Sequence, residues 1–397
     1  MIYLDNAATT LEKPPAVAHA MRWAMRHAGG VGRSAHPPAM LGADIVYDTR
    51  RLAAKLFDVP DPRRVIFTAN ATQALNMALY AMAQTCRHIA ISGFEHNAVY
   101  RPVLELVKRQ NIKLTILKSE LWNDDMLLEQ AQQAIADGAD CFVLCHVSNV
   151  FGYIQPLEPL DALLTKHGIP LILDASQSAG VVPLAVSQLH SLAAVGMPGH
   201  KGLYAPPGTG ILLWLSQDLP APLLLGGTGS LSEQTDMPDF LPDRLEAGTV
   251  NLAGIAGLFE GLQFISKLGE PEIAAWECRL RDAAAEKLRE IPGITLYLSP
   301  KPQQQTGVLS FTCRQLPCET IAQRLAEQNI CVRAGLHCAP LAHRTAGTIE
   351  TGTVRLSPGW FQSMRQIRKF CDALAHICGK ESNQICEDVG VTMMCDK

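Results

Sequence analysis

The sequence predicts an α/β fold with a large domain built on a mainly parallel sheet and a second, smaller α+β domain. Over the first 250 residues, short continuous apolar runs alternate with amphipathic helical stretches. This alternation is typical of a parallel sheet covered by helices on both faces. From about residue 256 onward the pattern changes to long helical stretches and short strand-like pieces. The 397 residues also exceed the length of one ordinary domain.

The large domain is expected to span residues 16–255. Its buried strands are predicted over five apolar runs, at residues 64–69, 88–93, 141–148, 169–176 and 210–215. Helices are predicted between them, at residues 72–84 and 125–138, where apolar residues recur with helical spacing.

The small domain is expected to combine residues 1–15 with residues 256–397. Its strand-like pieces, "ITLYLS", "GVLSFTC", "ICVRAG" and "TVRLSP", follow a long helical region and precede a last helix, "SMRQIRKFCDALAHIC". The stretch from about residue 380 is polar and weakly patterned, so we expect a mobile tail there.

Composition and charge limit the class of protein. The net charge of −4 and the lack of a long basic run argue against nucleic acid as the partner. No apolar run approaches the roughly 20 residues that span a bilayer, and the start, "MIYLDNAATT", lacks the apolar centre of a signal peptide. The twelve cysteines form no C-x-x-C pair, so we expect no metal site and mostly free thiols. We therefore expect a soluble cytoplasmic protein.

Polar residues follow four of the predicted strands. Because the carboxyl ends of parallel strands meet at one edge of a sheet, ligands bind there. The residues after these strands should converge on one site: Asn70-Ala71-Thr72, Glu95-His96-Asn97, Ser148-Asn149 and Asp174-Ala175-Ser176-Gln177.

A lysine and an aspartate suit the chemistry of pyridoxal phosphate. Lys201 lies in a turn rich in glycine and proline, "GMPGHKGLYAPPGTG", and Asp174 ends an earlier strand. The cofactor's aldehyde needs an amine for a Schiff base, and its ring nitrogen needs a carboxylate to stay protonated. From these two residues alone, an aspartate that caps a turn beside a surface lysine is an equal alternative.

Cys338 differs from the other cysteines in its context. It lies in the loop "RAGLHCAP", directly after a predicted strand and next to His337. An exposed loop thiol near a basic group can become a thiolate, the form that attacks. The alternative is an inert loop cysteine.

Ten motifs in order resemble the class V aminotransferase-like cysteine desulfurases and selenocysteine lyases. They are "YLDNAATT", "TANATQALN", "FEHNA", "VSNVFG", "DASQSAG", "GHKGL", "GGTGS", "EAGTVN", "RAGLHCAP" and "VRLS". The resemblance covers about residues 1–375. It implies the aspartate aminotransferase-like fold type I of pyridoxal-phosphate-dependent transferases, in a homodimer with shared active sites.

The resemblance also implies roles around the cofactor's ring. Lys201 would form the Schiff base, and Asp174 would keep the ring nitrogen protonated. His96 would stack on the ring, although a helix-capping histidine is the alternative. Gln177 would donate a hydrogen bond to the phenolic oxygen, and Asn149 would lie near that oxygen and the substrate. Both amides are alternatively turn formers.

The phosphate would be held by residues from three segments. By resemblance, Thr72 and the amides around Ala71 cradle it at the start of a helix, which favours an anion on its own account. His200 would add a contact, and Thr228 would reach the phosphate of the partner subunit's cofactor. The chain departs from the family at Pro198, where many relatives carry a serine whose hydroxyl binds phosphate.

The implied reaction converts L-cysteine to L-alanine and leaves the sulfur on Cys338 as a persulfide. Arg355 would hold the substrate carboxylate, with a surface strand charge as the alternative. Selenocysteine lyase, aminotransferase and degenerate sulfur-transfer partner are the other functions considered. The sulfur acceptor is not indicated, and Cys386 and Cys395 either relay a persulfide or lie in a disordered tail.

Overall fold

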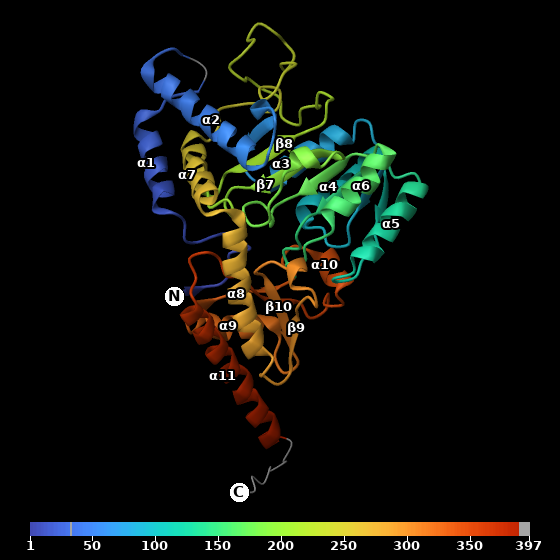
Figure 1. The fold of residues 1–397 in the computed structure, drawn as a ribbon, viewed down its shortest axis with the longest axis vertical. Helices are drawn as coiled ribbons and strands as arrows, with labels where there is room; N and C mark the ends of the chain where they lie inside the picture. Colours follow the sequence, from blue (N-terminus) through green and yellow to red (C-terminus); the bar gives the residue numbers. More distant parts are fainter. Residues whose placement is uncertain (32–33, 389–397) are drawn as a thin grey trace.

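The computed structural model describes residues 1–31 and 34–388, and of residues 380–388 the backbone only. The chain folds into a large sheet wrapped by helices, in the upper part of Figure 1, and a smaller helix-and-sheet part below it. Within the described residues, no helix combines the length and apolar character needed to cross a bilayer.

Seven strands form the large sheet, and the predicted mainly parallel arrangement is confirmed. Their spatial order is β2 (Val65–Thr68), β8 (Gly210–Trp214), β7 (Leu192–Pro198), β6 (Leu171–Asp174), β5 (Cys141–Cys145), β3 (His88–Ile91) and β4 (Lys113–Ile116). Strand β8 runs antiparallel to both of its neighbours, and all other pairs are parallel. Two strands of this sheet were not predicted from the sequence. Edge strand β4 alternates polar and apolar residues and is not fully buried, and β7 is a buried run that ends in Gly-Met-Pro, directly before the lysine turn.

Helices cover both faces of this sheet, as its alternating side chains require. In β5, Phe142 and Leu144 belong to one apolar core, whereas Cys141 and Val143 belong to the other. The second core is closed by α3 (Ala71–Met82) and α4 (Asn97–Gln110). The first is closed by α2 (Pro37–Leu56), α5 (Asp124–Ala136), α6 (Leu157–His167) and α7 (Leu252–Leu268), with α1 (Pro15–His27) packed on α7.

The smaller part is built on a four-stranded antiparallel sheet. Its order is β12 (Arg333–Gly335), β13 (Thr353–Leu356), β10 (Leu309–Cys313) and β9 (Ile294–Tyr297). Three helices pack here: α8 (Glu270–Leu288), α9 (Cys318–Ala326) and α11 (Met364–Asp388). The short α10 (Pro340–Thr345) follows β12, and 3-10 turns lie at Pro62–Arg64, Val186–Gln188 and Pro302–Gln304.

The amino terminus joins this smaller part. Strand β1 (Ile2–Tyr3) pairs in parallel with β11 (Ile330–Cys331), and Leu4 is buried in the same apolar core as β10 and β13. The predicted domain boundary at residue 255 falls inside α7, which packs against α1 and α2. The division of the chain into two domains stays a prediction.

The carboxyl-terminal helix is longer than expected. Helix α11 continues to Asp388, past residue 380, where a mobile tail was predicted to begin. Cys395 lies outside the described residues. Cys386 lies in the helix, and its side chain is also outside the described part.

Candidate active site

Ten of the predicted site residues line one cavity of about 220 Å³. The cavity lies at the carboxyl ends of the parallel strands, where polar residues were expected to converge. The ten are Ala71, Thr72, His96, Asn149, Asp174, Gln177, His200, Lys201, Cys338 and Arg355. Of the predicted site residues, Thr228 does not line it.

Lys201 places its amine inside this cavity, so it is not a surface lysine. Burial lowers the pKa of Lys201 to about 8, and the nearby Asp174 carboxylate opposes that shift. The glycine after the lysine is required by close packing, because a Cβ on Gly202 would lie 2.3 Å from the carbonyl oxygen of Ala179. The turn therefore carries an unusually easily deprotonated amine to the end of β7.

Asp174 is the last residue of β6 and is buried beside the lysine. Its Oδ1 accepts a hydrogen bond of 2.8 Å from the backbone N–H of Ser176. The carboxylate thus caps the following turn and also lines the cavity. The turn-capping alternative accounts for the hydrogen bond to Ser176 but not for the position of the carboxylate in the cavity wall.

His96 both caps a helix and lines the cavity. Its Nδ1 accepts a hydrogen bond of 3.0 Å from Ala98 N–H at the start of α4. Burial, together with the nearby charge of Lys201, lowers the pKa of His96 to about 4. The ring is therefore neutral at physiological pH and carries its proton on Nε2.

The amides of Asn149 and Gln177 already have backbone partners. Asn149 Nδ2 donates to the carbonyl oxygen of His337 at 2.8 Å, while its buried Oδ1 lacks a hydrogen bond. Gln177 Nε2 donates to the carbonyl oxygen of Ala7 at 2.9 Å. These bonds join the amino-terminal segment and the cysteine loop to the large sheet.

One end of the cavity is suited to an anion. Ala71 and Thr72 lie in the first turn of α3 and line the cavity. The backbone N–H groups at the start of a helix have no partner within the helix, so they can bind an anion. His200 adds a buried Nδ1 that lacks a hydrogen bond. Pro198 lies in the same cavity and offers neither a hydroxyl nor an N–H.

Thr228 lies elsewhere in this chain. It lines a separate cavity with Arg50 and Asp243, and its hydroxyl lies 3.1 Å from that of Ser230. The glycine-rich segment that carries it projects from the large part of the molecule (Figure 1).

Arg355 is buried, so the surface-charge alternative is wrong. Its Nη1 donates to the carbonyl oxygen of Asn149 at 2.8 Å, and its Nη2 forms an ion pair of 2.6 Å with Asp5 Oδ1. Its Nε is buried without a partner. A guanidinium group has five N–H donors, so three remain for a ligand.

Two charged residues of this site were not predicted from the sequence. Arg333 lines the cavity, lies opposite Arg355 in the antiparallel β12–β13 pair, and has no carboxylate partner among the described residues. Asp5 neutralises Arg355 from the amino terminus. Each has a sequence signal that went unused: Asp5 lies in "YLDNAATT", and Arg333 opens "RAGLHCAP".

Cys338 is the one exposed cysteine among the ten described. Its backbone φ is +57° and that of His337 is +51°, a left-handed conformation that is uncommon for residues other than glycine. The loop is held by Asn149 at the carbonyl of His337 and by Asn97 N–H, which donates to the carbonyl of Cys338 at 2.8 Å. The exposed thiol is therefore fixed at the cavity by its own backbone.

His337 does not activate the thiol directly. Its ring is buried and stacks on His343, with Nδ1 3.3 Å from His343 Nε2. Burial lowers the pKa of His337 to about 2, so this ring stays neutral. The basic group near Cys338 is instead Arg333, whose Nη2 lies 3.9 Å from the sulfur.

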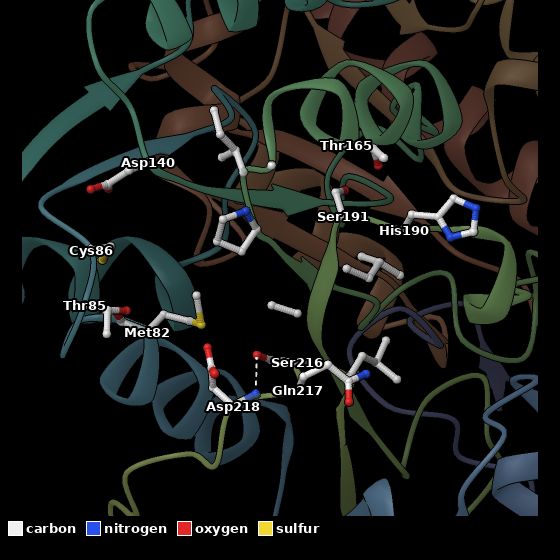
Figure 2. A pocket seen from close by; sticks show the side chains of 16 residues that line it. Met82, Thr85, Cys86, Asp140, Thr165, His190, Ser191, Ser216, Gln217 and Asp218 are labelled. Carbon is white, nitrogen blue, oxygen red and sulfur yellow. Dashed lines mark hydrogen bonds between the residues drawn. The ribbon is translucent and has the colours of Figure 1, made fainter.

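A larger, more open cavity of about 530 Å³ lies at the opposite edge of the sheet (Figure 2). Its wall includes Asp140, His190, Ser191 and Asp218 and contains no lysine, no arginine and none of the predicted site residues. The chemistry-bearing groups thus gather at the carboxyl edge. Among the described residues, no group of three or more His, Cys, Asp or Glu side chains is placed to hold a metal ion.

The sequence model of the class-V aminotransferases matches residues 2–370. The chain belongs to the class-V aminotransferase family. Among the curated members of this family, the chain is 32% identical to a "Probable cysteine desulfurase" of Pseudomonas putida, covering 94% of this chain and 92% of that protein. It is 28% identical to a "Probable cysteine desulfurase" of Pyrococcus abyssi, covering 95% and 94%.

Solved structures of the family agree with this assignment. The apo cysteine desulfurase of Thermococcus onnurineus superposes with a TM-score of 0.88 at 27% identity, over 96% of this chain and 95% of that one. The cysteine desulfurase CsdA of Escherichia coli superposes with a TM-score of 0.82 at 27% identity, over 96% and 94%. The predicted family and fold are confirmed.

Proposed function

We propose that this class-V aminotransferase-family protein is a pyridoxal-phosphate-dependent cysteine desulfurase. The observation that carries the proposal is one cavity lined by both the half-buried amine of Lys201 and the exposed thiol of Cys338. An aminotransferase needs the lysine but has no use for the thiol. The names of the similar proteins support the same activity.

Pyridoxal phosphate fits the polar groups that this cavity presents. Buried atoms without a hydrogen bond include Asn149 Oδ1, His200 Nδ1 and Arg355 Nε, and all three residues line the cavity. Together with the start of α3, they offer partners to an anionic, polar ligand. Lys201 would bind the cofactor covalently, Asp174 its ring nitrogen, and His96 one face of its ring.

When bound, the cofactor supplies an aldehyde for the amino group of the substrate and a protonated ring that withdraws electrons from the α-carbon. Lys201 is suited to move the α-proton, because its lowered pKa gives a useful fraction of free amine near neutral pH. Asp174 favours the protonated state of the ring nitrogen by its negative charge. His96 stays neutral, so it adds no competing positive charge.

Substrate orientation is assigned to Arg355. Its remaining N–H donors can hold the α-carboxylate of L-cysteine in the bidentate manner of a guanidinium group. The ion pair with Asp5 keeps the side chain in place. Asn149, whose carbonyl accepts from Arg355, contributes to the same wall.

Cys338 is assigned as the sulfur acceptor. Its thiolate attacks the substrate sulfur, a sulfur–sulfur bond forms, and the bond between that sulfur and the β-carbon breaks. The β-carbon gains a proton, so L-cysteine and the Cys338 thiol give L-alanine and the Cys338 persulfide. Arg333 would stabilise the anionic sulfur through its nearby guanidinium.

A homodimer with shared active sites would complete the phosphate-binding end of the cavity. The segment at residues 219–240 carries Thr228 and leaves several large apolar side chains exposed: Leu219, Leu223, Leu224, Leu225, Leu231 and Phe240. Exposed apolar residues gathered in this way mark a protein-binding surface. We propose that this segment packs on a second copy and brings Thr228 to the partner's phosphate, in compensation for Pro198.

The chemistry needs Cys338 as a reduced thiol, which supports a reducing, cytoplasmic setting. The persulfide would pass to an acceptor protein whose identity the site does not define, either directly from Cys338 or through Cys386 and Cys395. The exposed position of Cys338 favours direct transfer.

A side-by-side turnover assay tests the function. Purified protein supplied with pyridoxal phosphate is given L-cysteine or L-selenocysteine, and alanine is quantified together with sulfide or selenide. We expect alanine from L-cysteine with matching sulfur release. Alanine from L-selenocysteine alone would make the protein a selenocysteine lyase, and transfer of the amino group to a keto acid without sulfur release would make it an aminotransferase.

A further inference from the structure

We propose that Cys313 and Cys378 form a peroxide-reactive dithiol that closes to a disulfide outside the active site. Cys313 ends β10, and Cys378 lies on α11, the long helix that packs along the smaller part of the molecule (Figure 1). The two sulfur atoms are 3.9 Å apart, although the residues are 65 positions apart in sequence. Neither residue lines the cavity that holds Lys201 and Cys338.

The two thiols differ in access and in acidity, as a reactive pair requires. Cys313 is partly exposed, whereas Cys378 is only 2% exposed. The hydrogen bond from Cys378 lowers the pKa of Cys313 to about 6, and the same contact raises the pKa of Cys378. Cys313 is therefore the thiolate that meets an oxidant, and Cys378 is the thiol that resolves it.

The reaction balances with hydrogen peroxide as the oxidant. The Cys313 thiolate attacks one peroxide oxygen, the oxygen–oxygen bond breaks, and water leaves after protonation. The Cys378 sulfur then attacks the oxidised Cys313 sulfur and displaces a second water. Two thiols and one peroxide give one disulfide and two waters, so the sulfur atoms lose the two electrons that peroxide gains.

The geometry permits closure without rebuilding the fold. A disulfide requires the sulfur atoms to approach to about 2 Å, so the present 3.9 Å must shorten by about half. In the thiol form, Cys313 also contacts Gln315 Oε1 at 3.1 Å, and deprotonation removes that donated bond. The resulting link would fasten α11 to β10 across the apolar core that both elements share.

Cys278 provides a matched control. It is also partly buried, but its thiol donates to the backbone oxygen of Gln305 at 3.6 Å, and burial raises its pKa. It should react at least about tenfold more slowly than Cys313 with iodoacetamide at neutral pH, because only the thiolate is alkylated.

The test uses the folded, full-length protein with the Cys338→Ser substitution, so that the exposed thiol does not consume the oxidant. The protein is treated with hydrogen peroxide, remaining thiols are blocked, and non-reduced peptides are analysed by mass spectrometry. We expect a cross-link between the Cys313 and Cys378 peptides that has lost two hydrogens. It should disappear on reduction and in a Cys313→Ser variant, and persist in a Cys278→Ser variant.

Two results would overturn the proposal. One is that both thiols remain free for alkylation after peroxide treatment and unfolding. The other is that Cys313 accumulates as sulfinic or sulfonic acid with Cys378 still reduced, which would show that Cys378 does not resolve it. Because the cross-link is read in folded Cys338→Ser protein, which keeps both thiols, misfolding of the Cys313→Ser or Cys278→Ser variant does not affect either conclusion.

Discussion

The guanidinium Nη2 of Arg333 lies 3.9 Å from the sulfur of Cys338, and no carboxylate among the described residues pairs with Arg333. Its neighbour across the sheet, Arg355, is neutralised by Asp5. Like charges directly opposite each other repel, and Asp5 reduces this repulsion by neutralising Arg355. We therefore assign Arg355 to the substrate carboxylate and Arg333 to the reactive sulfur.

Replacing Arg333 should slow the chemistry of the thiol. We expect Arg333→Gln to reduce alkylation of Cys338 by iodoacetamide about two- to tenfold at neutral pH, because a partly exposed charge contact contributes roughly 1 kcal/mol. Arg333→Lys should recover part of the loss. An unchanged alkylation rate together with lowered cysteine affinity would instead assign Arg333 to the substrate carboxylate.

Lys201 should capture pyridoxal phosphate with a pH profile set by its desolvated amine. The rate of covalent capture, followed by the change in absorbance, should rise with pH and level off above about pH 8, because the pKa is lowered to that value and only the free amine reacts. Lys201→Ala should show no capture at any pH. Lys13, whose pKa burial also lowers to about 8, is the control, and Lys13→Ala should still capture the cofactor.

Asp174→Asn should slow removal of the α-proton. The substitution keeps the shape but removes the charge that favours a protonated ring nitrogen, and loss of a charge-assisted hydrogen bond costs about 1.5–3 kcal/mol, or about tenfold or more in rate. Exchange of the α-proton of L-cysteine with deuterated solvent measures this step. Asp161→Asn is the control. It removes another buried carboxylate, which accepts a hydrogen bond from Ser191 N–H near the start of β7, and it should leave the exchange rate unchanged. Equal exchange in both variants would refute the role of Asp174.

Cys338→Ala should separate the two halves of the reaction. The variant should still bind L-cysteine and exchange its α-proton, because Lys201 is intact, but it should form no alanine from L-cysteine. Cys331→Ala, on the adjacent β11, is the control and should retain turnover. Mass spectrometry of the wild type should find the added sulfur on the peptide that contains Cys338. Sulfur found only on Cys386 or Cys395 would contradict the assignment.

Asp5→Asn should destabilise the fold through Arg355. Removing one partner of a buried ion pair leaves an uncompensated charge, and because Asp5 is partly exposed we expect a loss of about 2 kcal/mol in the free energy of unfolding, measured with urea. Asp61→Asn breaks the exposed pair with Arg63 and should lower the free energy of unfolding much less, because water screens that pair. Equal losses of unfolding free energy in the two variants would show that the buried Asp5–Arg355 pair stabilises the fold no more than the exposed pair does.

Much of the site could be predicted because its residues follow strands. Asn149, Asp174 and Lys201 come directly after apolar runs, and strands that run in parallel bring such residues to one edge. Strand β4 was missed because an edge strand lacks the continuous apolar run that was used as the signal. The end of α11 was missed because its last residues are polar and show no core-facing pattern.

The sequence by itself determined the alternation of strands and helices, the polar strand ends, the lysine in its glycine-rich turn and the cysteine in its loop. These features depend on neighbouring residues and short periodicities, which are visible without coordinates. Only the tertiary structure decided that Lys201 is desolvated in the cavity with a lowered pKa, that Arg355 is paired with Asp5 350 positions away, and that Arg333 faces Cys338. Desolvation and charge pairing depend on which distant segments meet, and that is set by the packing of the two sheets rather than by any local pattern.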